Sequence, residues 1–72
     1  MNNLNVAKIQ LNGKQFQINA GIYLNELLNN LKIKINKVAI DVNGVIIEEN
    51  EYPKFKLNDN DKVEIVHFIG GG

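Results

Sequence analysis

The chain has 72 residues, about half the length of a typical domain, and its eight lysines balance eight aspartates and glutamates. It contains no Cys, Ser, Thr, Arg or Trp and a single histidine, His67, which excludes the usual side-chain nucleophiles, disulfides, thiol redox chemistry and cysteine- or histidine-ligated zinc. A net charge of zero without arginine also argues against nucleic-acid and membrane-surface partners, because both require clustered positive charge.

The first predicted element is a hairpin. Apolar and polar residues alternate over residues 7–11 and again over residues 15–18. Asn12-Gly13 separates the two runs, and this dipeptide favours a type I′ turn because both central residues of that turn need a positive φ. We therefore expect two antiparallel strands with one buried face.

After Ala20-Gly21 the period becomes that of an amphipathic helix. Its apolar stripe has the spacing i, i+3, i+4, i+7 and consists of Leu24, Leu27, Leu28 and Leu31. Tyr23 stands three residues before Glu26, where a capping box has Ser or Thr. Because a tyrosine hydroxyl cannot accept the same backbone hydrogen bond, we expect a weaker helix start than the stripe suggests.

The second half of the chain predicts further strands. Residues 38–42 alternate again, and Asn43-Gly44 repeats the hairpin signal before an apolar run over residues 45–47. A polar stretch over residues 48–57 is followed by a turn at residues 58–61. A last strand begins at Val63 and runs to about residue 68.

This order of elements predicts an α+β domain of the β-grasp (ubiquitin-like) type, with a mixed four- to five-stranded sheet packed on one main helix. The whole chain, residues 1–72, forms a single domain in this prediction. Residues 1–5 are a leader, and residues 70–72 are a flexible glycine tail.

Few side chains are candidates for chemistry. Two groups of acidic residues could be imagined as metal or carboxylate sites: Glu48, Glu49 and Glu51, and Asp59 and Asp61. The second group lacks the glycine and the distal glutamate of a calcium loop. We expect both groups to be solvated and predict no metal site. His67 is interpreted as a partly exposed sheet residue, because no nucleophile accompanies it.

The three terminal glycines, Gly70, Gly71 and Gly72, allow two interpretations. In one, they are an inert tail. In the other, the absence of Cβ atoms lets the tail enter a channel too narrow for side chains, and three extended residues span about 10 Å. The ionised terminal carboxylate can then attack the α-phosphate of ATP, and a sulfur, nitrogen or oxygen nucleophile can attack the acyl adenylate.

Three segments resemble one family. They are Val38 to Gly44 (VAIDVNG), Asp61 to Gly72 (DKVEIVHFIGGG) and the helix segment Glu26-Leu27-Leu28. Together they are similar to ThiS, the ubiquitin-like sulfur carriers of thiamine biosynthesis. The resemblance extends from about Ala7 to the end of the chain, and its most specific feature is a strand that runs into a terminal Gly-Gly.

The resemblance implies a protein co-substrate rather than an enzyme, with no cofactor bound to the chain itself. Gly72 carries first an adenylate, made by a ThiF-type, E1-like adenylyltransferase from ATP and magnesium, and then a thiocarboxylate. The sulfur comes from cysteine through a desulfurase, and a ThiG-type thiazole synthase takes it into the thiazole ring. The resemblance also implies that Gly71 lies in the active-site channel of the partner and that Gly70 mainly lengthens the tail.

A docking surface is also expected, because a tail alone gives little selectivity. If Val63 and Ile65 face the core, alternation turns Val66 and Phe68 to the opposite face, where they form a candidate partner patch. The alternative is a local twist or bulge that buries both side chains.

Other functions with a similar tail stay open at this point. They are the small subunit of molybdopterin synthase, a ubiquitin-like protein modifier and an interaction module with an inert tail. No apolar run reaches the roughly 20 residues of a membrane span and no signal peptide is recognisable, so a cytoplasmic location is expected.

Overall fold

The computed structural model describes residues 5–68. Along the chain it contains β1 (Val6–Leu11), β2 (Lys14–Asn19), α1 (Leu24–Asn30), η1 (Ile35–Lys37), β3 (Val38–Val42), β4 (Val45–Ile47), η2 (Glu49–Lys54) and β5 (Lys62–His67). The elements η1 and η2 are short 3₁₀ helices, and η2 lies within the polar stretch of residues 48–57, where no helix is predicted from the sequence.

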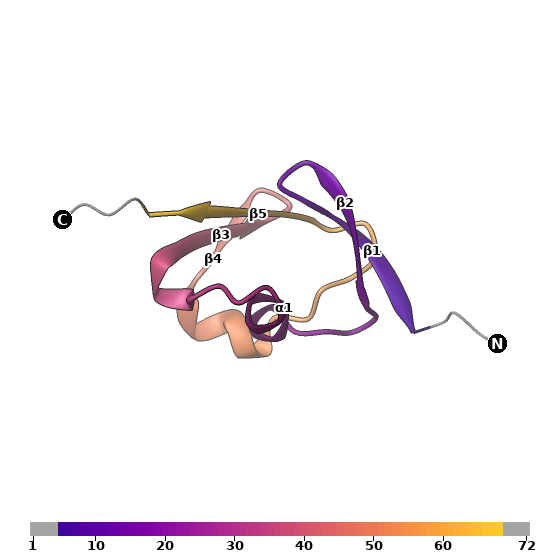
Figure 1. Cartoon of the computed structure of the whole chain (residues 1–72), viewed down its shortest axis with the longest axis horizontal. Helices are drawn as coiled ribbons and strands as arrows, with labels where there is room; N and C mark the ends of the chain where they lie inside the picture. The colour runs from indigo at the N-terminus through magenta and orange to yellow at the C-terminus, as the bar shows by residue number, and fades with distance from the viewer. Residues whose placement is uncertain (1–4, 69–72) are drawn as a thin grey trace.

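The five strands form one mixed sheet in the order β2-β1-β5-β3-β4 (Figure 1). The last strand of the sequence, β5, is therefore the central one. It runs parallel to β1 and antiparallel to β3, while each hairpin pairs its own two strands antiparallel. The predicted α+β class and β-grasp topology are confirmed, with five strands rather than four.

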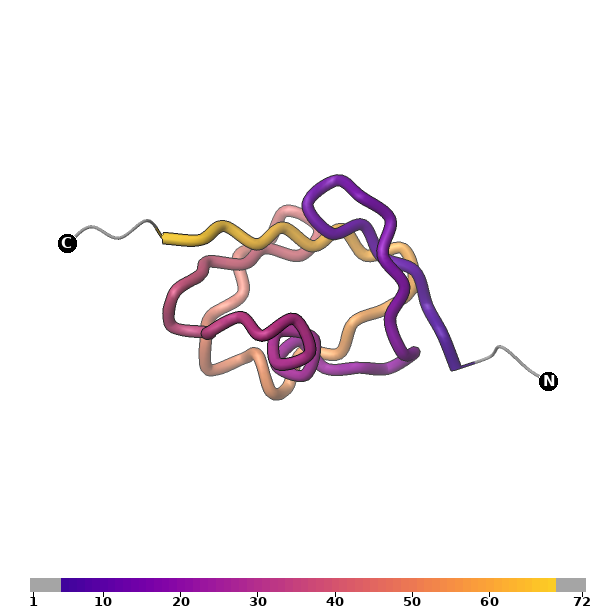
Figure 2. Tube along the Cα trace, viewed as in Figure 1, coloured from indigo at the N-terminus to yellow at the C-terminus, as the bar shows by residue number. Residues whose placement is uncertain are grey.

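The helix α1 and the 3₁₀ helix η2 lie side by side on one face of the sheet (Figure 2). The predicted leucine stripe faces inward, with Leu24 and Leu28 completely buried. Each such side chain stabilises the fold by about 1.5–3 kcal/mol relative to an exposed one. The core residues contributed by the sheet include Ile9, Ile40 and Val63.

Both Asn-Gly dipeptides form the predicted tight turns. Asn12 and Gly13 have φ values of 50° and 84°, and Asn43 and Gly44 have values of 54° and 84°. Positive φ at both central residues is the requirement of a type I′ turn, which matches the twist of the flanking strands.

The turn residue Asn12 also holds the central strand. Its Nδ2 donates to the carbonyl of Ile65 at 3.1 Å, and its Oδ1 accepts the N–H of Ile65 at 2.7 Å. The side-chain amide thus takes the place of a strand residue at the point where β1 turns away from β5.

The side chain of Asn43 holds the β5 segment from the other side, next to β3. Its Oδ1 accepts the N–H of Lys62 at 2.9 Å, and its Nδ2 donates to Oδ1 of Asp61 at 2.9 Å. The other oxygen of Asp61 accepts the N–H of Asn58 at 2.8 Å. The turn before β5 is thereby tied to the β3–β4 turn.

Two expectations about polar residues need correction. Asp61 is only 9% exposed, so it is not a solvated turn residue; its carboxylate is buried because it has these hydrogen-bond donors. Asn5 was assigned to the leader, but its carbonyl accepts the N–H of Ala20 at 2.7 Å and so belongs to the first hairpin.

The start of α1 has half of a capping box. The Glu26 carboxylate accepts the N–H of Tyr23 at 2.9 Å, whereas the Tyr23 side chain makes no capping hydrogen bond. The aromatic ring instead lies under Lys56, with Nζ 5.9 Å from its centroid. Tyrosine is therefore tolerated here through contacts with the neighbouring segment.

We predict that Asn12→Gly lowers the free energy of unfolding by about 1–3 kcal/mol, since glycine keeps the positive φ but loses both hydrogen bonds to Ile65. Urea unfolding measures this change. Asn60→Gly is the matched control, because Asn60 also has a positive φ (73°) and its side chain makes no hydrogen bond to another described residue. Equal stability of the two variants would show that the Asn12 amide does not hold β5.

Candidate functional site: the C-terminal end of the central strand

The central strand β5 leads directly to the predicted reactive terminus. It ends at His67, and the N–H of Phe68 donates to the carbonyl of Lys37 at 2.9 Å. Regular pairing with the β3 side therefore continues to the last described residue. The predicted tail residues Gly70, Gly71 and Gly72 lie outside the described residues.

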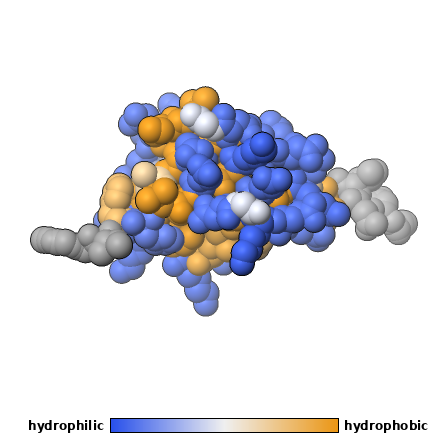
Figure 3. Space-filling view, turned by 90° about the horizontal axis from the view of Figure 1, so that it is seen from above, coloured by the Kyte–Doolittle hydropathy of each residue, from blue (hydrophilic) through white to orange (hydrophobic). Residues whose placement is uncertain are grey.

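The side chains of Val66 and Phe68 are 59% and 60% exposed, whereas Val63 and Ile65 are buried. The alternative of a bulge that buries both is wrong, because β5 keeps its register with β3 and pairs Val66 with Ala39. Figure 3 looks onto this outer face and shows apolar side chains gathered in the half nearest the C-terminal end. The predicted patch is thus an exposed surface at the end of β5.

The remaining polar candidates do not converge on this patch. His67 is exposed and pairs with Val38, so its side chain is on the helix-facing side of the sheet. Glu48, Glu49 and Glu51 are exposed at the beginning of η2, as expected. Among residues 5–68 no group of three or more His, Cys, Asp or Glu side chains could hold a metal ion.

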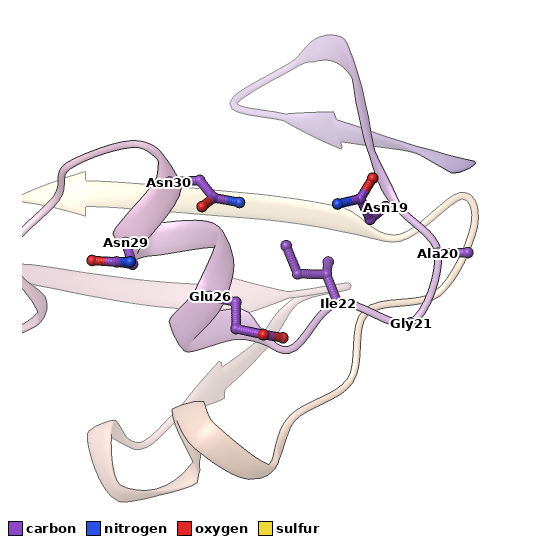
Figure 4. Close-up of a pocket in the computed structure, with 7 residues that line it drawn as sticks. All are labelled: Asn19, Ala20, Gly21, Ile22, Glu26, Asn29 and Asn30. Carbon is purple, nitrogen blue, oxygen red and sulfur yellow. The ribbon is translucent and has the colours of Figure 1, made fainter. Parts of the chain in front are cut away.

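A separate hollow lies beside the loop that joins β2 to α1. Its volume is about 450 Å³, and it is lined by the β2–α1 loop and the exposed side of α1 (Figure 4). Asn19 and Asn30 point toward one another across Ile22, and Glu26 lies at its lower edge. Its lining offers amides and one carboxylate, far from the end of β5, and we assign it no role.

Sequence reasoning missed two features of this region. The Asn-Gly pairs signalled turns, but the attachment of their side chains to β5 depends on strands distant in sequence. It also missed that Asp41 and Glu64 stand directly opposite one another on β3 and β5. That pairing follows from the strand register, which no local pattern specifies.

The comparisons with known proteins agree with this arrangement. A family model described as ThiS family matches residues 9–72, which is most of the chain and includes the glycine tail. The chain belongs to the ThiS family. The resemblance seen in the sequence is thereby confirmed.

Relatives of this ThiS-family chain have several names. The sulfur carrier protein ThiS of Bacillus subtilis is 36% identical over 66 residues, covering 89% of this chain and 98% of its own. An uncharacterised protein, ycf40, of Porphyra purpurea is 38% identical over the full length of both chains. The thiazole synthase of Magnetococcus marinus is 40% identical over 65 residues, and this chain spans only 20% of that protein.

The solved structures support the same fold. The crystal structure of the thiamine biosynthesis protein ThiS from Geobacter metallireducens has a TM-score of 0.79 and 29% identity, and the match covers 90% of this chain and 99% of that one. A solution structure of the thiamine biosynthesis protein from the same organism gives a TM-score of 0.74. The chain is a ThiS-type sulfur carrier of thiamine biosynthesis, as the sequence predicted.

Tyr52, which anchors η2 in the core of this ThiS-family fold, gives a pH-dependent prediction. Burial raises the pKa of Tyr52, and the nearby carboxylates of Glu49 and then Glu48 raise the pKa further. The native state therefore keeps the phenolic proton at a pH where the unfolded chain loses it. Stability should fall as the pH rises above about 10, through the range between the two pKa values.

Tyr52→Phe should lose less stability than the wild type over that range, because it lacks the titrating group. Thermal unfolding at pH 8 and near pH 11 measures the difference. Tyr23→Phe is the control for the general effect of alkali. An identical loss in the wild type and Tyr52→Phe would contradict the raised pKa.

Proposed function

We propose that Gly72 is the covalent site of this sulfur carrier. Its terminal carboxylate attacks the α-phosphate of ATP, and pyrophosphate leaves. Hydrosulfide then displaces AMP from the acyl adenylate and gives a thiocarboxylate. If the nucleophile is instead the terminal sulfur of a desulfurase persulfide, a thiol reductant must then cleave the S–S bond of the acyl disulfide to release the thiocarboxylate. The observation that supports this proposal most directly is that the ThiS family match runs to the final glycine.

The residues before Gly72 have supporting roles in this proposal. Gly70 and Gly71 lie in the partner's active-site channel, which their lack of Cβ atoms allows to be narrow. The carrier is a protein co-substrate rather than an enzyme, and it binds no cofactor of its own. ATP and magnesium belong to the activating enzyme.

The proposed partners follow the order of the chemistry. A ThiF-type, E1-like adenylyltransferase activates Gly72, a cysteine desulfurase supplies sulfur, and a ThiG-type thiazole synthase receives it. Support for the last partner comes from the Magnetococcus marinus thiazole synthase, part of which is similar to this chain. No helix among residues 5–68 is long and apolar enough to cross a membrane. We expect the reaction to take place in the cytoplasm.

The exposed patch of Val66 and Phe68 supports a docking role in the same proposal. A tail of a few glycines provides little specific contact, and stable interfaces bury about 800 Å² on each partner. Apolar side chains beside the tail supply contact area where any partner that holds the tail must lie. We therefore assign docking to this patch.

One prediction of this proposal concerns the covalent modification of Gly72. Incubation with ATP, magnesium and a ThiF-type enzyme should add an adenylate to the wild-type chain, because its terminal carboxylate is the nucleophile. A sulfur donor should then convert it to a species heavier than the free chain by the difference between a sulfur and an oxygen atom. Intact mass spectrometry measures both products.

A chain truncated after Gly70 is the control and should show neither mass. An unchanged wild-type mass, with an enzyme that adenylates Bacillus subtilis ThiS, would contradict the proposal. Isopeptide adducts on lysines would favour a protein modifier instead. Sulfur transfer to a molybdopterin precursor rather than to thiazole would favour the molybdopterin synthase subunit.

Another prediction of this proposal concerns the docking of the carrier on its activating enzyme. Phe68→Asp should raise the KM of the ThiF-type enzyme for the carrier by about tenfold or more, since a charge replaces an apolar contact. The thermal transition should hardly change, because substitutions at exposed positions are usually worth less than about 0.5 kcal/mol. Adenylate formation at varied carrier concentration gives KM.

Val45→Asp is the matched control for docking. Val45 is 63% exposed but lies at the β3–β4 turn, on the helix-facing side of the sheet. The KM of the ThiF-type enzyme for the Val45→Asp carrier should equal its KM for the wild-type carrier. Loss of cooperative unfolding in Phe68→Asp, or equal KM values for both variants, would remove the docking role.

A further inference from the structure

The outer face of β3, β4 and β5 combines apolar residues with two acids. The register places Ile46, Asp41 and Glu64 in one row across the three strands. The adjacent row, one step closer to the tail, contains Ala39 and Val66. Ile46 is 74% exposed, so the apolar surface continues from β5 across to β4.

The acids in this surface face each other. Asp41 and Glu64 are directly paired across antiparallel strands, which places their Cβ atoms about 4.5–5.5 Å apart on the same face. Like charges in that position destabilise a sheet. Repulsion between the two carboxylates therefore lowers the stability of the isolated domain. A positive charge placed between them would replace this repulsion with attraction.

The surface beside the pair is hollowed. A depression of about 410 Å³ is lined by Asp41 and Glu64, by the Asn43-Gly44 turn and by Lys62. Two carboxylates and one ammonium leave the depression with a formal charge of minus one. This negative charge is complementary to a basic side chain of another protein.

The length of the tail determines which surface a partner covers. Four residues follow Phe68, and four extended residues span at most about 14 Å. A protein that holds Gly72 in its active site must therefore lie against the tail end of the sheet. Val66 lies near that end of β5, and Ile46 and the acidic pair lie on the same face of the sheet.

We propose that the activating enzyme inserts an arginine or lysine between Asp41 and Glu64 while its apolar surface packs on Ala39, Ile46, Val66 and Phe68. This inference rests on the proposed adenylation of Gly72. A Gly-Gly terminus is chemically the same in any carrier. An activating enzyme must therefore recognise its own carrier by the surface of the folded domain. Complementary charge set within an apolar contact provides that selection.

The test is the double variant Asp41→Asn, Glu64→Gln, which keeps side-chain size and removes both charges. We expect the KM of a ThiF-type enzyme for the carrier to rise about tenfold, with kcat unchanged. We also expect the wild-type KM to rise with salt and the variant KM to respond much less, because salt screens the attraction. The assay is the initial rate of adenylate formation.

The control is Glu49→Gln, Glu51→Gln, which has the same change in net charge on the exposed acids of η2. Its KM and salt response should match those of the wild type. Unfolding provides a readout that separates recognition from a structural role. The Asp41→Asn, Glu64→Gln variant should be as stable as the wild type or more stable, since repulsion is removed.

The possible outcomes distinguish the two proposals. If an enzyme that adenylates Bacillus subtilis ThiS leaves the wild-type chain unmodified, the proposed function fails and this inference fails with it. If the wild type is adenylated but the Asp41→Asn, Glu64→Gln variant has the same KM and salt response, only this inference is overturned. A variant that loses stability, or a control pair with the same rise in KM, overturns it too.

Discussion

The position of the central strand depends on two asparagine side chains. Strand β5 lies between two hairpins, and the turn of each hairpin begins with an asparagine whose side-chain amide bonds to the β5 segment. Asn12 makes two hydrogen bonds to the backbone of Ile65, and Asn43 bonds to the N–H of Lys62 and to the carboxylate of Asp61. One residue type thus supplies the positive φ of the turn and the hydrogen bonds that locate the strand.

This arrangement matters for the proposed function because β5 leads to the glycines on which that chemistry is proposed to take place. Its inward side chains, Val63 and Ile65, are buried in the core. Its outward side chains remain available to other proteins. The fold therefore presents Val66, Phe68 and Glu64 on one face of a paired strand, while the proposed chemistry takes place on the glycines beyond it. In the proposed function, selectivity comes from this surface rather than from the glycine tail.

Much of the fold could be predicted from local patterns. The two Asn-Gly turns, the leucine stripe of α1 and the alternation around Val63 each report a backbone conformation or a buried face within a few residues. The chemistry proposed for the tail also comes from the sequence, where the absence of Cys, Ser and Thr and the terminal glycines are visible, and it stays a prediction. Asp61 was misjudged, because a turn-like run of Asn and Asp contains no information about the distant amide that buries it.

The sequence by itself determined the strands, the main helix, the β-grasp order and the family, because periodicity, turn chemistry and the terminal motif are local properties. Only the tertiary structure decided which side chains meet. It placed Asp41 opposite Glu64, put Ile46 on the same face of the sheet as Val66 and set Asn12 against Ile65. These contacts depend on strand order and register, and both result from packing the whole core, because a shift of one residue would move every side chain to the other face.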